Sequence, residues 1–289
     1  MGTARGRPHD AHVPTSTRCL VSLTLSVAVA VGLATAGLSA GPAAAASLPP
    51  FDVSTLALAR ADLTTLVNDQ RVARGLVPLQ VPPTATAMAV SRAQSMASKD
   101  ALSHAGPDGQ TIFDAIRASG MTWFGAGEVI AFNTNPGEPE STNQAVADWL
   151  ASPIHASIVL SSDYNYVGFA AAVSSTGNRY YAGVFLKLPD RTAGWARVGR
   201  VTRTILDASH SRVTVRWIGG DTRLQVLTAG LRDFEIQRRL AGGAWQPAKT
   251  TTHTSLSITL VRGTSYEFRV RSRDKAGNRS PWSSVSVRT

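Results

Sequence analysis

The chain has almost no cysteine: Cys19 is the single one among 289 residues. Cys19 lies in an apolar N-terminal stretch, so a chain cleaved after Ala46 would contain none. The sequence therefore excludes disulfide bonds, a thiol nucleophile and a cysteine-rich zinc cluster from the cleaved protein. Its stability must come from packed hydrophobic cores, which a chain of this length can supply.

Long apolar runs are also scarce, and the one that stands out extends from Cys19 to about Ala40. Three arginines precede it and Ala43–Ala46 closes it, the order of charge, apolar core and small residues that is typical of a secretory signal peptide. We predict a signal peptide over residues 1–46 and a secreted, extracellular protein. A retained signal anchor is the alternative, because about 20 apolar residues can span a bilayer. No transmembrane segment is expected after cleavage.

Acidic residues are few in the last third of the chain. Residues 47–192 hold nine basic and twelve acidic side chains, whereas residues 193–289 hold seventeen basic and six acidic ones. The net charge of +10 therefore belongs almost wholly to the C-terminal segment. We expect this segment to be attracted to an anionic cell-envelope polymer or a lipid surface. No nucleic-acid partner is expected, since no nucleic-acid-binding motif is present.

The periodicity of apolar residues divides the rest of the chain in two. Helical spacing predicts helices near residues 53–75, 83–97, 111–119 and 142–152, followed by strands at 164–173 and 179–188. Residues 125–128 are expected to form a glycine-containing loop. Beyond a linker at 189–194, short alternating runs predict a β-sandwich. The fold class is α+β, with domains at 47–190 and 197–289.

Two histidines and one glutamate are the candidate site. Of six histidines, His104 and His155 are the ones that fall in the first domain, and Glu128 lies between them. Imidazole can act as a base or a metal ligand near neutral pH, and a carboxylate can orient it. The spacing does not show that the three side chains meet, and the local HExxH motif is absent. A half-buried structural role for each of them is the alternative.

The motifs around these residues occur in a characteristic order. They are Asn68–Arg71, Gly75–Leu79, Ser103–Thr111, Gly125–Glu128, Trp149–His155 and Tyr166–Gly168. Over residues 54–188 the chain closely resembles the bacterial branch of the CAP superfamily, the SCP-like domains related to cysteine-rich secretory and pathogenesis-related proteins. The resemblance implies an α-β-α sandwich with a surface cleft, in which histidines and acidic residues converge and bind a divalent metal in some members.

On this resemblance, His104, Glu128 and His155 are the candidate cleft and ligand-binding residues, and His104 and His155 are candidate ligands of a divalent metal such as Zn²⁺. Tyr166 stands where the family sometimes has histidine, and it is included among the ligand-binding residues. Val129 replaces the asparagine that commonly follows the glutamate. No catalytic residue is assigned, since these departures remove polar groups beside the cleft. A Ser103–His104 nucleophile and base is disfavoured, because adjacent side chains rarely have that geometry.

Residues 197–289 resemble a fibronectin type III domain. Trp217, the approach to Tyr266 and the segment from Gly277 to Ser283 carry the resemblance. Arg269, Arg271 and Arg273 alternate on one predicted strand, so they should project from one face.

Together these features predict a secreted bacterial CAP-domain protein. Its His/Glu cleft would take a ligand or a divalent metal, and its basic fibronectin-type domain would tether it to the cell envelope. The alternative is a metal-assisted extracellular hydrolase acting on peptide, lipid or cell-wall substrates. A purely structural adhesion protein is the third possibility.

Overall fold

The computed structural model describes residues 53–106, 108–135 and 137–289, and side chains from Ala59 onward. The predicted signal peptide, residues 1–46, lies outside the described residues. No helix in the described part of the chain is long and apolar enough to cross a membrane.

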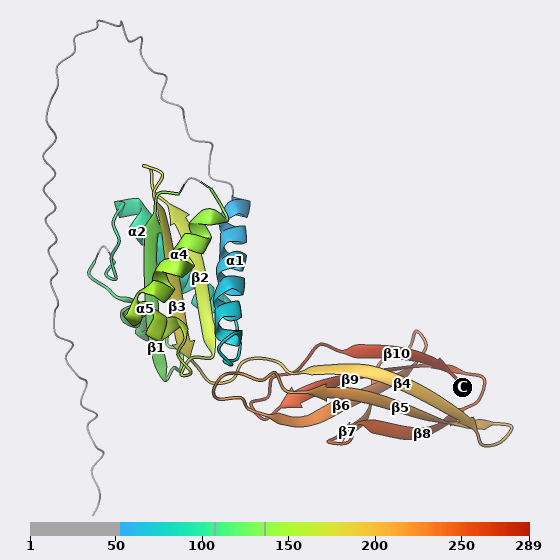
Figure 1. Ribbon diagram of the computed structural model, residues 1–289. Helices are drawn as coiled ribbons and strands as arrows, with labels where there is room; N and C mark the ends of the chain where they lie inside the picture. The colour runs from blue at the N-terminus through green and yellow to red at the C-terminus, as the bar shows by residue number, and fades with distance from the viewer. Residues whose placement is uncertain (1–52, 107, 136) are drawn as a thin grey trace, which may run out of the picture. The chain divides into compact units, whose positions relative to one another are not determined.

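The first domain is a three-layer α-β-α sandwich (Figure 1). Its sheet has the antiparallel order β1-β3-β2. The strands are β1 (Gly125–Asn133), β2 (Tyr166–Val173) and β3 (Arg179–Lys187). The helices are α1 (Val53–Val72), α2 (Pro83–Lys99), α3 (Ile112–Ala118), α4 (Glu140–Ala151) and α5 (Pro153–Val159).

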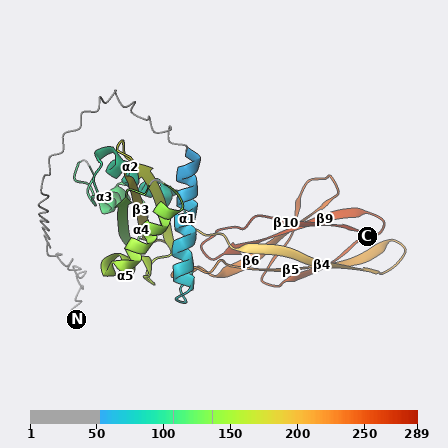
Figure 2. The same ribbon diagram turned by 45° about the horizontal axis from the view of Figure 1, so that its top comes forward.

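Side chains on the two faces of the sheet pack into two separate hydrophobic cores. On β3, Ala182 and Val184 pack with α2 and α3, whereas Tyr181 and Phe185 pack with α1, α4 and α5. Successive side chains of a strand point to opposite faces, so this central strand contributes to both cores. Figure 2 shows α2 and α3 together, away from α1 and α4. The predicted α-β-α architecture is confirmed for this domain.

A glycine on β2 lets α2 lie directly on the sheet. A Cβ at Gly168 would come within 2.1 Å of the Ala85 carbonyl group. No side chain other than hydrogen fits there, so the position determines how closely α2 packs on β2.

Strand β1 corrects the expectation of a loop at residues 125–128. Residues Gly127–Ala131 of β1 form a continuous buried run, because helices cover both faces of the strand at this point. A strand covered on both faces lacks the polar alternation by which exposed strands are recognised. Helix α5, which contains His155, was also not predicted.

The C-terminal region is a sandwich of two antiparallel sheets, with orders β10-β9-β6-β7 and β4-β5-β8. Its strands are β4 (Trp195–Ile205), β5 (His210–Gly220), β6 (Leu231–Leu240), β7 (Gln246–Thr251), β8 (Ser255–Val261), β9 (Ser265–Asp274) and β10 (Ser283–Arg288). Alternate residues such as Val213, Val215 and Trp217 fill the core between the sheets. The predicted β-sandwich is confirmed, whereas β4 and β7 were not identified from the pattern.

Candidate functional site

Glu128 is the centre of the predicted site and is held in a buried ion pair. It lies on β1 with its side chain 4% exposed. The Nε of Arg92 donates to its Oε1 at 2.6 Å, and Nη2 of Arg92 donates to Oε2 at 3.4 Å. Glu128 and Ile130 are two residues apart on β1, so their side chains lie on the same face of the strand. Ile130 packs in the core formed with α2, and the strand therefore directs the carboxylate of Glu128 toward α2.

Arg92 was missed in the sequence and is central to the site. It lies on the face of α2 that buries Ala85, Ala89, Ala93 and Met96. A charged residue on an otherwise small and apolar face was the signal that could have revealed it, because buried arginines require a partner. Its Nη2 also donates to the carbonyl oxygen of Ser103 at 2.9 Å. Arg92 thus fixes both the carboxylate and the loop that precedes His104.

His104 completes the contact that the sequence suggested. Its Nδ1 lies 2.7 Å from Oε2 of Glu128, and its side chain is 55% exposed. The carboxylate favours the tautomer that carries the proton on Nδ1, which leaves Nε2 free to accept a proton or bind a ligand. Arg92, Glu128 and His104 form one hydrogen-bonded group, which we call the Arg–Glu–His relay.

His155 lies near the relay without a hydrogen bond to it among the described residues. It is half-buried on α5, a helix that packs against β1. Burial lowers the pKa of His155, and the nearby charge of His104 lowers it further. A Cβ at Gly127 would lie 3.0 Å from Ile158, so this glycine allows α5 to approach the strand beside Glu128. His104 therefore acts electrostatically on His155.

Tyr166 forms no hydrogen bond with Arg92, Glu128 or His104 in the described structure and lies instead at the linker between the two domains. Its side chain is buried, and its hydroxyl group lies 2.9 Å from Oγ1 of Thr192 and accepts a hydrogen bond from the backbone N–H of Arg191 at 2.8 Å. The structure does not bring this tyrosine to the relay. Instead it holds the segment that leads into the β-sandwich.

The relay offers a metal one imidazole, that of His104, and His155 would supply a second. Arg92 and His104 engage both oxygens of Glu128. The donor set is therefore one ligand short of the three protein ligands that are typical of a catalytic zinc site.

Among the described residues, Asp190, Asp221 and Asp274 offer three donors that lie within 4.8 Å of one another. Carboxylates suit a hard divalent cation. Each of the three already accepts hydrogen bonds from nearby backbone amides. Burial raises the pKa of Asp221, and the charges of Asp190 and Asp274 add to that effect. The group is separate from the histidines and was not predicted.

A cavity of about 450 Å³ lies beside Arg92, between α2 and the loop that contains Gly106 and Gln110. Its lining residues include Ser91, Ser95 and Gln110. Neither His104 nor His155 lines it. Arg92 is the member of the relay that borders this cavity.

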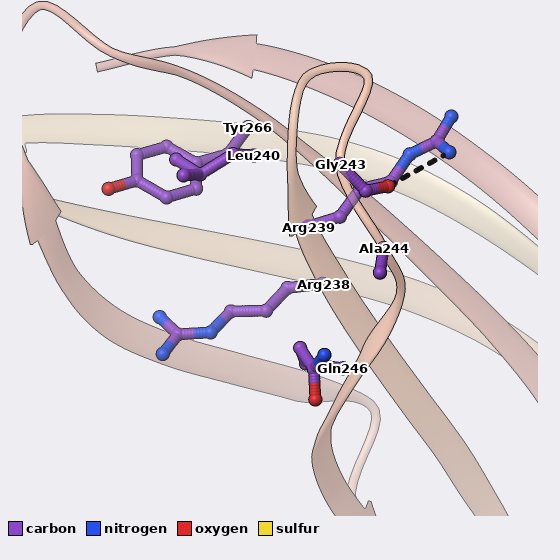
Figure 3. Close-up of a pocket in the computed structure, with 7 residues that line it drawn as sticks. All are labelled: Arg238, Arg239, Leu240, Gly243, Ala244, Gln246 and Tyr266. Atoms are coloured by element: carbon purple, nitrogen blue, oxygen red, sulfur yellow. Dashed lines mark hydrogen bonds between the residues drawn. The ribbon is translucent and has the colours of Figure 1, made fainter.

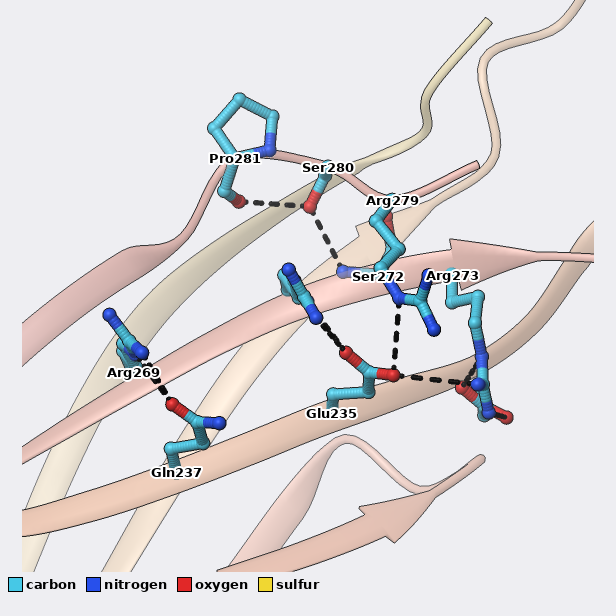
Figure 4. Close-up of polar contacts among 10 residues, drawn as sticks. Glu235, Gln237, Arg269, Ser272, Arg273, Arg279, Ser280 and Pro281 are labelled. Atoms are coloured by element: carbon cyan, nitrogen blue, oxygen red, sulfur yellow. Dashed lines mark hydrogen bonds and ion pairs between the residues drawn. The ribbon is translucent and has the colours of Figure 1, made fainter. Parts of the chain in front are cut away.

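The predicted arginine stripe on β9 is present, but each of its members has a partner. Arg271 and Arg273 pair with Glu235 and Asp233 on β6, and Arg269 donates to Gln237 (Figure 4). Trp245 and Trp282 stack between the guanidinium groups, at 4.3 to 4.5 Å from ring centroid to Cζ. Burial alone would raise the pKa of Glu235, but the hydrogen bond and charge of Arg271 outweigh it and hold the pKa below its usual value. The stripe is a cross-strand ladder.

At one end of this ladder, Arg238, Arg239, Gly243 and Tyr266 line a cavity of about 410 Å³ (Figure 3). Arg239 donates to the carbonyl oxygen of Gly243 at 3.3 Å and pairs with Glu267. Arg238 forms no ion pair within the described residues.

The family model described as CAP, the cysteine-rich secretory protein family, matches residues 64–185, which supports a CAP (SCP-like) domain there.

One curated relative is the "Uncharacterized protein YkwD" of Bacillus subtilis (strain 168), 29% identical over 103 residues. The match covers 36% of this chain and spans 38% of the length of that relative. Among solved structures, an outer surface protein from Borrelia burgdorferi is 18% identical with a TM-score of 0.41, covering 45% of this chain and 93% of that one. An extracellular SCP-domain protein from Bacillus anthracis str. Ames is 19% identical with a TM-score of 0.41, covering 48% of this chain and 45% of that one.

Proposed function

We propose that this is a secreted bacterial CAP-domain protein whose Arg–Glu–His relay, together with His155, binds a ligand or a divalent metal outside the cell. We further propose that the β-sandwich is a fibronectin type III domain whose positive charge holds the protein at an anionic cell envelope. The observation that carries the first part is the 2.7 Å contact between Nδ1 of His104 and Glu128.

The buried ion pair behind this contact supports a role in ligand binding, because burying charged groups costs free energy of folding. Arg92 and Glu128 are both buried, and burying an ion pair seldom stabilises a fold by itself. The pair orients a histidine whose ring is more than half exposed. An exposed imidazole with a fixed tautomer is prepared to accept a hydrogen bond, a proton or a metal at Nε2.

A divalent metal would be held by His104 and His155, with Glu128 orienting His104 from the second coordination shell. A bound metal would act as a Lewis acid toward an oxygen ligand. With two protein ligands, solvent or an external ligand must complete the coordination. We therefore expect weak binding that a bound ligand strengthens.

Titration calorimetry with Zn²⁺ tests this proposal. We expect heat of binding from the wild type and none from a His104→Ala, His155→Ala double variant. The matched control is a His210→Ala, His253→Ala double variant, which removes two exposed histidines of the β-sandwich. Identical traces for the wild type and the first variant would refute metal binding at the relay.

A metal-assisted hydrolase is the second candidate function. The observation that favours it is the exposed ring of His104 held by the carboxylate of Glu128, since an imidazole oriented in this way can transfer a proton. Hydrolysis of cell-wall peptide that is lost in both His104→Ala and His155→Ala, while the fold is retained, would support it. Full activity in both variants would exclude it.

Electrostatic binding of the basic β-sandwich to the cell envelope is tested in a separate experiment. The whole protein is applied to cell-envelope preparations and eluted across a salt series. Retention that falls steeply with salt supports electrostatic tethering, because counterions screen interactions between exposed charges. Absent or salt-insensitive retention would overturn it.

A further inference from the structure

One sheet of the β-sandwich carries positive charge with no acidic residue on its strands. The acidic residues Asp233, Glu235 and Glu267 all belong to β6 and β9, where they pair with arginines. Strands β4, β5 and β8 hold no aspartate or glutamate. Their arginines are exposed, and none forms an ion pair within the described residues; they are Arg197, Arg200, Arg203, Arg212 and Arg216.

The strand register places Arg212 and Arg216 among hydroxyl groups. Arg212 lies opposite Thr204 on one side and Thr259 on the other. The next outward row is Thr202, Thr214 and Ser257, and then Arg216 lies opposite Ser255. Val213 and Val215 point into the core between these rows. We call the outward side of β4, β5 and β8 the arginine–hydroxyl face.

We propose that the arginine–hydroxyl face is the docking surface for a linear polymer with phosphodiester groups. This inference rests on the proposed tether and states which face and which chemistry provide it.

Three observations favour a phosphodiester polymer. All cations of these three strands are arginines, whose planar guanidinium groups match the oxygens of a phosphate better than lysine does. Serine and threonine hydroxyls lie between them and can donate to the further acceptor oxygens that a phosphodiester presents. Arg212 and Arg216 are four residues apart on one strand, or about 13 Å, so several charged groups of one chain can be bound at once.

The composition of the face disfavours a lipid bilayer as its occupant. Its exposed apolar side chains are Trp195 and Ile218 at one end and Val261 at the other, with arginines and hydroxyls between them. Insertion into a membrane surface needs a continuous apolar face. Scattered apolar ends do not provide one.

The test compares binding of the whole protein to immobilised poly(glycerol phosphate). We expect an Arg212→Gln, Arg216→Gln double variant to bind at least about tenfold more weakly than the wild type, because it loses two guanidinium groups that attract the anionic polymer. The charge-matched control is Lys249→Gln, Lys275→Gln, which removes two exposed lysines outside the face and should retain most of the affinity. Melting temperatures verify that both variants fold.

The outcomes separate this inference from the proposed tether. If the wild type fails to bind envelope and polymer alike, the tether and the face both fail. If the wild type binds but the two double variants lose affinity equally, the tether stands and the face is wrong. Stronger binding to vesicles of anionic phospholipid, or to a carboxylate polymer, than to poly(glycerol phosphate) would overturn the phosphodiester assignment.

Discussion

At the scale of single residues, the relay depends on a charge that the sequence did not reveal. Glu128 and Arg92 have side chains that are 4% and 7% exposed, so each neutralises the other where water cannot. Removing one partner leaves the other buried and unpaired, which costs far more than the pair contributes.

The first prediction concerns this pair. We expect Glu128→Ala to lower the free energy of unfolding by about 3 kcal/mol, measured by urea denaturation. Replacing both partners by apolar residues, as Arg92→Met with Glu128→Leu, should recover much of the loss. Asp163→Ala is the control, since its 3.9 Å contact with Lys187 is at the surface and should contribute little. A Glu128→Ala protein as stable as the wild type would contradict the account.

His155 should make stability depend on pH. Its pKa is lowered in the folded state, first by burial and then by His104. As the pH falls through the ordinary histidine value of about 6.5, the unfolded chain takes up the proton first, so stability falls until the folded pKa is passed. Between pH 7 and pH 5 we expect the urea denaturation midpoint of His155→Gln to fall less than that of the wild type. His253→Gln, at an exposed position, should leave the loss unchanged, and a flat wild-type profile would argue against the mechanism.

At the scale of elements, close packing of α2 on β2 sets the frame in which Arg92 reaches Glu128. Both α2 and β2 were predicted from apolar periodicity, and both were found within two residues of their expected ends. The distance between them follows from Gly168, which has no side chain to separate them.

We expect Gly168→Ala to destabilise the domain by about 2 to 3 kcal/mol, because the added methyl group overlaps the Ala85 carbonyl group. Thermal denaturation measures the loss. Gly125→Ala is the matched control: it is also a strand glycine, but its added Cβ would find its nearest neighbour at 3.6 Å. Equal stability of the two variants would contradict a steric role for Gly168.

Element prediction failed where burial removed the pattern. Strand β1 was taken as a loop because Gly125 and Gly127 resemble turn residues and the buried run after them does not alternate. Helix α5 was not recognised because it is only seven residues long and follows α4 after one residue. Both elements position the site, β1 through Glu128 and α5 through His155.

At the scale of the whole molecule, the two halves of the chain differ in charge as the composition predicted. The structure adds that several arginines of β6 and β9 pair with carboxylates across the strands, whereas none of the arginines of β4 and β5 forms an ion pair among the described residues. The structure also identifies hydrogen bonds at the linker between the first domain and the β-sandwich. The hydroxyl group of Tyr166 binds the linker at Arg191 and Thr192, and Asn278 donates to the carbonyl oxygen of Asp190.

We expect Tyr166→Phe to loosen this linker without unfolding either half. Trypsin should then cleave after Arg191 several times faster, as followed by mass spectrometry of the fragment that ends there. Tyr164→Phe is the control, since no hydrogen bond of its hydroxyl group is found in the described structure. Equal cleavage rates in both variants would show that the Tyr166 hydroxyl does not restrain the linker.

Composition and local order predicted the division of the chain, the helical and alternating segments and the charge asymmetry, and they named His104, Glu128 and His155 as candidates. These properties depend on local order and composition, which can be read along the chain. Folding brings Arg92 to Glu128 and His104, places Tyr166 at the linker, and pairs Arg271 and Arg273 of β9 with carboxylates of β6 while the arginines of β4 and β5 have no such partner among the described residues. Each of these depends on which distant residues face one another, and strand register and helix packing set that only when the chain folds.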